Sequence, residues 1–194
     1  MVWKMMLAAL ACALVAPTYA ATLIVNSSGI LTGAAGVDVG GTSYDVEFVS
    51  GSCTEVFGTC SQASFAFKGV TSARSAGQAL LDQVLLNVPQ GQFDSQPNLT
   101  NGCPLSNECI IEIPYTTVLV GSTPFVSTIE AVNFSSSASD IVIGSTYVTS
   151  VRLPFARFTL SPAPEPATWA MMLAGFGAIG AAMRRRQRMS VRVG

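Results

Sequence analysis

Apolar and polar residues alternate along several short stretches in the middle of the chain. Within Ser43–Val49, aromatic or aliphatic residues occupy every second position, and polar residues fall between them. Because successive side chains of a strand point to opposite faces, this pattern predicts a half-buried strand. Similar runs predict strands at Thr22–Val25, Ser64–Phe67, Cys109–Ile113, Thr116–Val120, Ser127–Phe134, Thr146–Leu153 and Phe155–Leu160.

One stretch, Ser72–Leu86, has helical spacing instead. Ser72 is a suitable N-cap and Pro89 follows the expected end of the helix. The apolar residues that recur three or four positions apart are Ala76, Ala79, Leu80, Val84 and Leu86. Residues 21–160 are therefore expected to form a mainly β or α+β exported domain, a β-sandwich with one helix on or beside a sheet.

The first twenty residues have the pattern of a secretory signal peptide. The apolar run Met5–Ala16 follows one basic residue and is too short to span a bilayer. Small residues at Thr18 and Ala20 suit signal peptidase, so we expect export through the Sec translocon and removal of residues 1–20. An alternative is a lipoprotein signal at Cys12, although the residue three positions before it is not the usual leucine.

The C-terminus has a second pattern that is typical of a targeting segment. Residues 161–166 contain three prolines, which favour an extended chain, and the uncharged stretch 167–183 follows. As a helix this stretch would be about 25 Å long, close to the ~30 Å hydrocarbon core. Trp169 would lie at the outer interface, and three basic residues would stop transfer on the cytoplasmic side. These basic residues are Arg184, Arg185 and Arg186.

Charge is distributed unevenly along the chain. Only 11% of the residues are charged, and the overall net charge is −1. Between Ala21 and Ala163, however, ten acidic and four basic residues give a net charge of −6. Nucleic-acid binding depends mainly on neutralising phosphates with Lys and Arg, so no nucleic-acid partner is expected.

The C-terminal residues resemble the PEP-CTERM sorting signal in its PEPxxWA form. The resemblance rests on four residues, on the apolar stretch behind them and on the arginines that end it. The four expected sorting residues are Pro164, Glu165, Pro166 and Trp169. The resemblance implies that residues 161–194 are recognised by an exosortase, a membrane cysteine protease that cuts near Pro-Glu-Pro and passes the protein toward the cell surface. Such systems accompany exopolysaccharide and biofilm production. The same segment is sometimes labelled after an ice-binding protein, and that label does not describe the rest of the chain.

Four cysteines remain after removal of the signal peptide. In an oxidising compartment this even number predicts two disulfides, for which three pairings are possible. Turn-rich sequence around each pair favours the local pairings, Cys53 with Cys60 and Cys103 with Cys109. The alternative, a four-cysteine metal site, would need closer spacing within each pair.

The absence of histidine removes most familiar catalytic chemistry. The chain contains no histidine, so it lacks the usual neutral-pH base and the common catalytic triads. Carboxylates remain as candidates, and the nearest pairs in sequence are Asp45 with Glu47 and Glu108 with Glu112. Asp45 and Glu47 are more simply the polar face of a strand. No spacing typical of a calcium loop occurs, so neither a metal nor a cofactor is expected.

These observations favour a non-enzymatic protein of the cell surface or extracellular matrix. It would be anchored in the inner membrane with its body in the periplasm, then processed by an exosortase, and it would associate with exopolysaccharide. One alternative is a secreted hydrolase that cuts polysaccharide with carboxylates alone. A second alternative is a single-pass membrane protein whose anchor is never removed.

Overall fold

The structure is a computed structural model that describes residues 21–162, 171–180 and 184. The predicted signal peptide, with Cys12, lies outside these residues. The chain divides into two compact units, Met1–Leu160 and Ser161–Gly194. In the second unit, residues 171–180 are helical and exposed.

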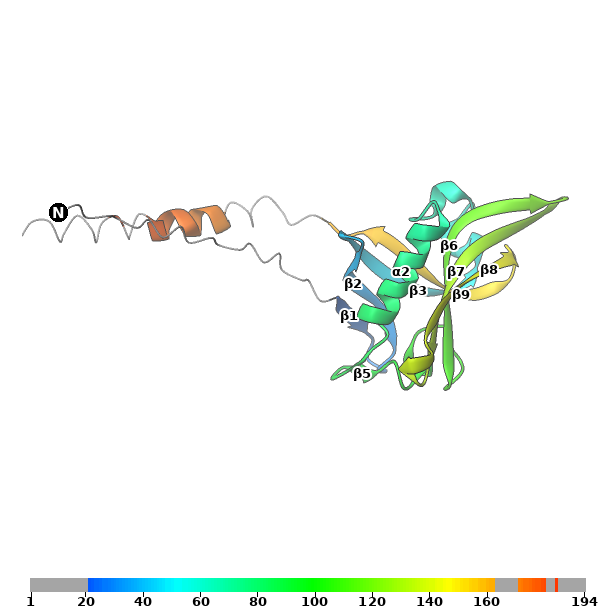
Figure 1. Ribbon diagram of the computed structural model, residues 1–194, viewed down its shortest axis with the longest axis horizontal. Helices are drawn as coiled ribbons and strands as arrows, with labels where there is room; N and C mark the ends of the chain where they lie inside the picture. Colours follow the sequence, from blue (N-terminus) through cyan, green and yellow to red (C-terminus); the bar gives the residue numbers. More distant parts are fainter. Residues whose placement is uncertain (1–20, 163–170, 181–183, 185–194) are drawn as a thin grey trace, which may run out of the picture. The chain divides into compact units, whose positions relative to one another are not determined.

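The first unit is built around one sheet of seven strands (Figure 1). The order of the strands is β1-β2-β3-β9-β6-β7-β8. Neighbouring strands are antiparallel, except for β6 and β9, which are parallel and joined by the single pair Glu112 and Phe155. The strands are β1 Thr22–Val25, β2 Leu31–Val39, β3 Thr42–Ser52, β6 Glu108–Val120, β7 Thr123–Phe134, β8 Ile141–Val148 and β9 Arg152–Leu160.

The β-rich prediction is confirmed, but the predicted sandwich is wrong. All seven long strands belong to one sheet, and the helix α2 (Val70–Gln83) packs on it where a second sheet would lie. The remaining short elements are the helix α1 (Cys53–Phe57), the 3-10 turns η1 (Gln62–Ser64), η2 (Pro97–Leu99) and η3 (Ser137–Ser139), and the hairpin of β4 (Asn87–Val88) and β5 (Gly91–Gln92).

The sheet bends sharply between its two halves. Only residues 149–151 separate β8 from β9, although β7 and β6 lie between those strands in the sheet. Strands are spaced about 4.8 Å apart, so this short connection requires the end of β8 to approach the start of β9. Two backbone hydrogen bonds of Thr149 stabilise this connection. Its N–H donates to the carbonyl of Pro124 at 3.1 Å, and its carbonyl accepts from the N–H of Cys53 at 3.1 Å.

The helix is shifted by two to three residues from its predicted position. It begins after Gly69, and the Ser72 hydroxyl donates to the carbonyl of Gly69, so Ser72 lies in the first turn and is not the N-cap. At the other end, the carbonyl of Leu80 accepts hydrogen bonds from two successive amides, which ends the helix and turns Leu85 into the core. Leu86, predicted to be on the apolar side, is 38% exposed.

Helix α2 lies across the sheet (Figure 1). Its middle packs on three strands, because a Cβ added at Gly77 would lie 3.1 to 3.5 Å from side-chain carbons of Val142, Ile129 and Ile113. Its last residue, Gln83, exchanges two hydrogen bonds with the backbone of Asp38 on β2. A 14-residue helix, about 21 Å long, thus joins both halves of the bent sheet.

The predicted strand Ser64–Phe67 is wrong. The chain forms the 3-10 turn η1 there, and then an irregular segment leads to α2. The Lys68 ammonium group folds this segment back on itself, because it donates hydrogen bonds to three backbone carbonyls, one of them within the predicted strand. These carbonyls belong to Gln62, Ala63 and Phe65.

Two further strand boundaries are wrong. The predicted strand Thr146–Leu153 spans the turn between β8 and β9, which a hydrogen bond from the Val151 N–H to the Val148 carbonyl closes. The two strands predicted on either side of Pro114 are one strand, β6, with an irregular register beside the proline, which lacks an N–H for the ladder. Strand β2 was not predicted, because its glycines and alanines give no clear alternation.

A bulky residue at Gly77 should separate α2 from the sheet. We expect Gly77→Leu to lower the free energy of unfolding by about 3 kcal/mol, because the added side chain would overpack a closed contact. The matched control is Gln78→Leu, one residue along the helix on its exposed side, which should change it by less than about 0.5 kcal/mol. Urea denaturation followed by circular dichroism measures both, and equal effects would contradict the described packing.

Candidate functional site

A cluster of polar side chains is buried on the face of the sheet opposite α2. Ile111 and Ile113 on β6 join the core under α2, so Glu112 between them points to the other face. Glu130 on β7 lies directly across from Glu112 in the antiparallel register. The bend of the sheet encloses this face, and α1 with the segment after it covers part of it.

The acidic pair is almost completely removed from water. Glu112 is 1% exposed and Glu130 is 4% exposed. The Tyr147 hydroxyl on β8 donates to Oε1 of Glu130 at 2.5 Å. Among the described residues, no hydrogen-bond partner lies near Oε2 of Glu112 or near Oγ1 of Thr128. One carboxyl oxygen and one hydroxyl are thus buried without a partner, which is uncommon in proteins.

No basic side chain in the described part of the chain pairs with either acid of this pair. Arg152 pairs with Glu55, and Arg157 pairs with Glu47. Arg74 donates to the carbonyl of Val142, and Lys68 donates to the carbonyls around η1. The four basic residues of the body thus have their contacts elsewhere, and none of the residues that the structure describes supplies a countercharge to the buried carboxyls.

Without a countercharge, the Glu112 carboxyl retains its proton to a higher pH than usual. The pKa of Glu112 is raised to about 8, first because burial disfavours the charged carboxylate and also because Glu130 is close. The nearby hydroxyls of Thr128 and Tyr147 oppose this rise in part. Burial also raises the pKa of the Tyr147 hydroxyl, and its hydrogen bond to Glu130 adds to that effect. At pH 7, Glu112 is therefore mainly a neutral carboxylic acid.

Glu112 lies at the wall of a pocket of about 200 Å³. The pocket is mostly apolar, and Leu105 at its edge is 48% exposed. Its other apolar walls are Ile110, Leu153, Pro154 and the disulfide between Cys103 and Cys109. Glu108 and Tyr147 supply the remaining acidic and hydroxyl groups.

The pairs of carboxylates suggested by the sequence lie in two places. Asp45 and Glu47 share one face of β3, where Glu47 pairs with Arg157 and Asp45 accepts from the N–H of Gly36 at 3.1 Å. Glu108 and Glu112 line the same pocket.

The sequence pattern did not predict Glu130 or Tyr147. Pairing of β6 with β7 places Glu130 beside Glu112, and Tyr147 reaches Glu130 from β8. An acidic residue inside an apolar strand was the one available signal, since Glu130 follows Ile129 and precedes Ala131.

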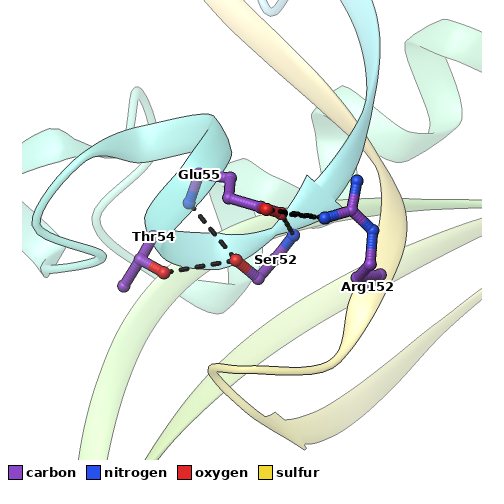
Figure 2. A network of polar contacts seen from close by, with 4 residues as sticks. All are labelled: Ser52, Thr54, Glu55 and Arg152. Carbon is purple, nitrogen blue, oxygen red and sulfur yellow. Dashed lines mark hydrogen bonds and ion pairs between the residues drawn. The ribbon is translucent and has the colours of Figure 1, made fainter.

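A polar network at the start of α1 fixes the segment that covers this face (Figure 2). The Ser52 hydroxyl accepts from the N–H of Glu55 at 3.3 Å, and the Glu55 carboxylate accepts from the N–H of Ser52 at 2.7 Å. This capping box starts the helix directly after β3. Arg152 reaches the same carboxylate at 2.5 Å, so the start of β9, just before Leu153, is tied to α1.

The disulfides have the two local pairings that the sequence favours. Cys53 is joined to Cys60 beside the small core under α1, and Cys103 is joined to Cys109 at the pocket. The cysteines thus form two separate crosslinks and do not form the four-cysteine metal site considered as an alternative.

The predicted sorting residues fall mainly outside the described part of the chain. Pro164, Glu165, Pro166 and Trp169 are not among the described residues, and neither are Arg185 and Arg186. Arg184 is helical and exposed. The described residues include 171–180 of the predicted membrane helix 167–183, and none of the helices among them is long and apolar enough to span a membrane.

Comparison with known families identifies this part of the chain. Residues 162–186 match the family model of the PEP-CTERM protein-sorting motif. The chain is therefore an exported protein that is directed to an exosortase. Searches of curated proteins and of solved structures found no match to the chain.

Titration of Glu112 should make the protein less stable as the pH rises. The unfolded carboxyl titrates near 4.5 and the folded one near 8, so between these values the folded state holds a proton that the unfolded chain releases. Stability is therefore fully present below about pH 4.5 and declines up to about pH 8, by an amount on the order of 5 kcal/mol.

Urea denaturation of Glu112→Gln at several pH values between 4.5 and 9 measures this dependence. The variant cannot ionise at this position, so its stability relative to the unsubstituted protein should increase with pH. Glu108→Gln, on the same strand and pocket but half-exposed, is the control and should keep the original slope. Parallel curves for Glu112→Gln and the unsubstituted protein would contradict the assignment.

Proposed function

We propose that this protein is a non-catalytic component of the cell surface or extracellular matrix of a Gram-negative bacterium. The observation that carries the proposal is the match of residues 162–186 to the PEP-CTERM sorting motif. In this proposal the Sec translocon exports the chain, and signal peptidase removes residues 1–20. Residues 167–183 hold it in the inner membrane with its body in the periplasm until an exosortase cuts near Glu165, and the released body associates with exopolysaccharide.

The burial of the acidic pair supports a non-catalytic role. Glycoside hydrolysis by two carboxyls requires one on each side of the scissile bond, so both must reach the substrate. Glu130 is 4% exposed, its Oε1 accepts from Tyr147, and it is not part of the pocket wall. Only Glu112 of this pair contributes to the pocket. The chain also contains no histidine that could act as the second catalytic group in place of Glu130.

A carboxylate-dependent hydrolase remains a second candidate function because of one specific observation. Glu108 and Glu112 line the same pocket, and the raised pKa of Glu112 suits a general acid. Two such groups could protonate a glycosidic oxygen and activate water. Release of reducing ends from the exopolysaccharide of the host, lost in both Glu108→Gln and Glu112→Gln, would support this candidate over the non-catalytic one.

Replacing the glutamate of the Pro-Glu-Pro motif should block processing. We expect the intact mass of the surface or secreted form to lack the residues after the motif, and we expect Glu165→Ala to retain them in the membrane fraction. The comparison uses mass spectrometry of both fractions from the native host. Ser161→Ala, which lies just before the matched residues, is the control and should be processed normally.

An uncut C-terminus in both the unsubstituted protein and Glu165→Ala would contradict processing. It would leave the third possibility, a protein that stays anchored by residues 167–183 with the same topology. A cut in both proteins would contradict the role assigned to Glu165.

Association with exopolysaccharide should be visible in the matrix of the native host. We expect the processed protein to sediment with the polysaccharide fraction and to become soluble when the polymer is digested by an added glycosidase. The strain that carries Glu165→Ala should lose the matrix-bound protein because it retains the anchor. An even distribution between polymer and supernatant would contradict the association, and it would leave processing by the exosortase untouched.

A further inference from the structure

The pocket beside Glu112 combines three features that point to a ligand. Its volume is about 200 Å³, the room of six or seven water molecules in the liquid. One of its wall residues, Glu112, is 1% exposed and carries an oxygen, Oε2, without a hydrogen-bond partner among the described residues. Most of the other walls are apolar. A buried carboxyl without a partner is costly unless another group satisfies it.

No basic side chain of the described body pairs with Glu112. Glu130 lies opposite Glu112 in the register, and the described basic residues of the body have their recorded contacts elsewhere. The body as a whole, from Ala21 to Ala163, has a net charge of −6, which attracts cations to it. A ligand that carries a positive charge would therefore supply what the surrounding chain lacks.

We propose that this pocket binds a small primary amine, with its ammonium group against the carboxyl of Glu112 and its apolar part against Leu105 and Leu153. An ammonium group offers three hydrogen-bond donors, which suit the oxygens of the Glu112 carboxyl. The apolar walls favour an organic cation over a metal ion, which would need several oxygen ligands. No group of three or more potential metal-ligating side chains occurs in the described part of the chain. The proposal goes beyond the sorting function and does not depend on it.

Binding of the amine should displace the proton of Glu112. The titratable groups that face this carboxyl are Glu130 from β7, Tyr147 from β8 and Glu108 from its own strand. Strand β9 faces it with Phe155 and Pro154, which do not titrate. Because Glu112 is mainly protonated at pH 7, the ammonium group exchanges for nearly one proton. At pH 9 the carboxyl is already ionised and the exchange disappears.

Calorimetric titration of the exported full-length chain in detergent tests the proposal with n-butylamine as the probe and 1-butanol as its neutral counterpart. The buffers contain no primary amine and differ in ionisation enthalpy, so the comparison counts released protons. Phosphate and HEPES serve at pH 7, and borate and CHES serve at pH 9. We expect butylamine to bind at least tenfold more tightly than butanol at pH 9. Its affinity should rise about tenfold between pH 7 and pH 9, with about one proton released at pH 7 and none at pH 9.

Glu112→Gln should lose both the preference for the amine and the release of the proton. The control Asp82→Asn removes an exposed carboxyl of α2 that does not line the pocket, and it should keep both. If Glu112→Gln does not fold, the unsubstituted protein provides a second test. Carbon NMR of its glutamate carboxyls should show one high pKa, and butylamine should lower that pKa. An amino sugar, glucosamine, tests whether the amine comes from a polysaccharide instead of an alkyl compound. Equal binding of butanol and butylamine, or binding without proton release at pH 7, would overturn the proposal.

Discussion

The short connection between β8 and β9 is the constraint on which the rest of the domain depends. Residues 149–151 must bridge strands that are separated by two others in the sheet, so the sheet can form only if it bends. The bend leaves one face for α2 and encloses the other, where Glu112 and Glu130 meet away from water. Helix α2 then joins the two halves from outside through Gly77 and Gln83. The pocket and the buried acids are thus products of the sheet's topology.

Local sequence patterns predicted the positions of strands and helices better than they predicted which strands pair. Strand β1 and most of β3 and β7 follow from alternation, and helical spacing located α2 to within three residues. The run Thr146–Leu153 failed because its turn contains no glycine or proline to interrupt the pattern. The meeting of Glu112 and Glu130 could not be predicted, since it depends on a register between residues 18 positions apart. The two acids are therefore neighbours in a sheet whose order the sequence does not reveal.

The two units of the chain carry different kinds of information. The C-terminal motif is a linear signal that a membrane protease can recognise from a few residues, and a family model finds it without any knowledge of the body. In the body, the buried acidic cluster is assembled from three strands, so its members are far apart in the sequence. The sorting motif and the acidic cluster can therefore change independently, since no residue of the cluster lies within the matched segment.

Both disulfides join cysteines that are consecutive in the exported chain, Cys53 with Cys60 and Cys103 with Cys109. A chain that crosses the membrane from its N-terminus presents each cysteine to the oxidising side just before its correct partner. If thiols are oxidised in order of emergence, the first available partner is the native one, and no bond has to be exchanged later. The order of the cysteines therefore suits oxidation during translocation, before the distant strands that complete the sheet have arrived.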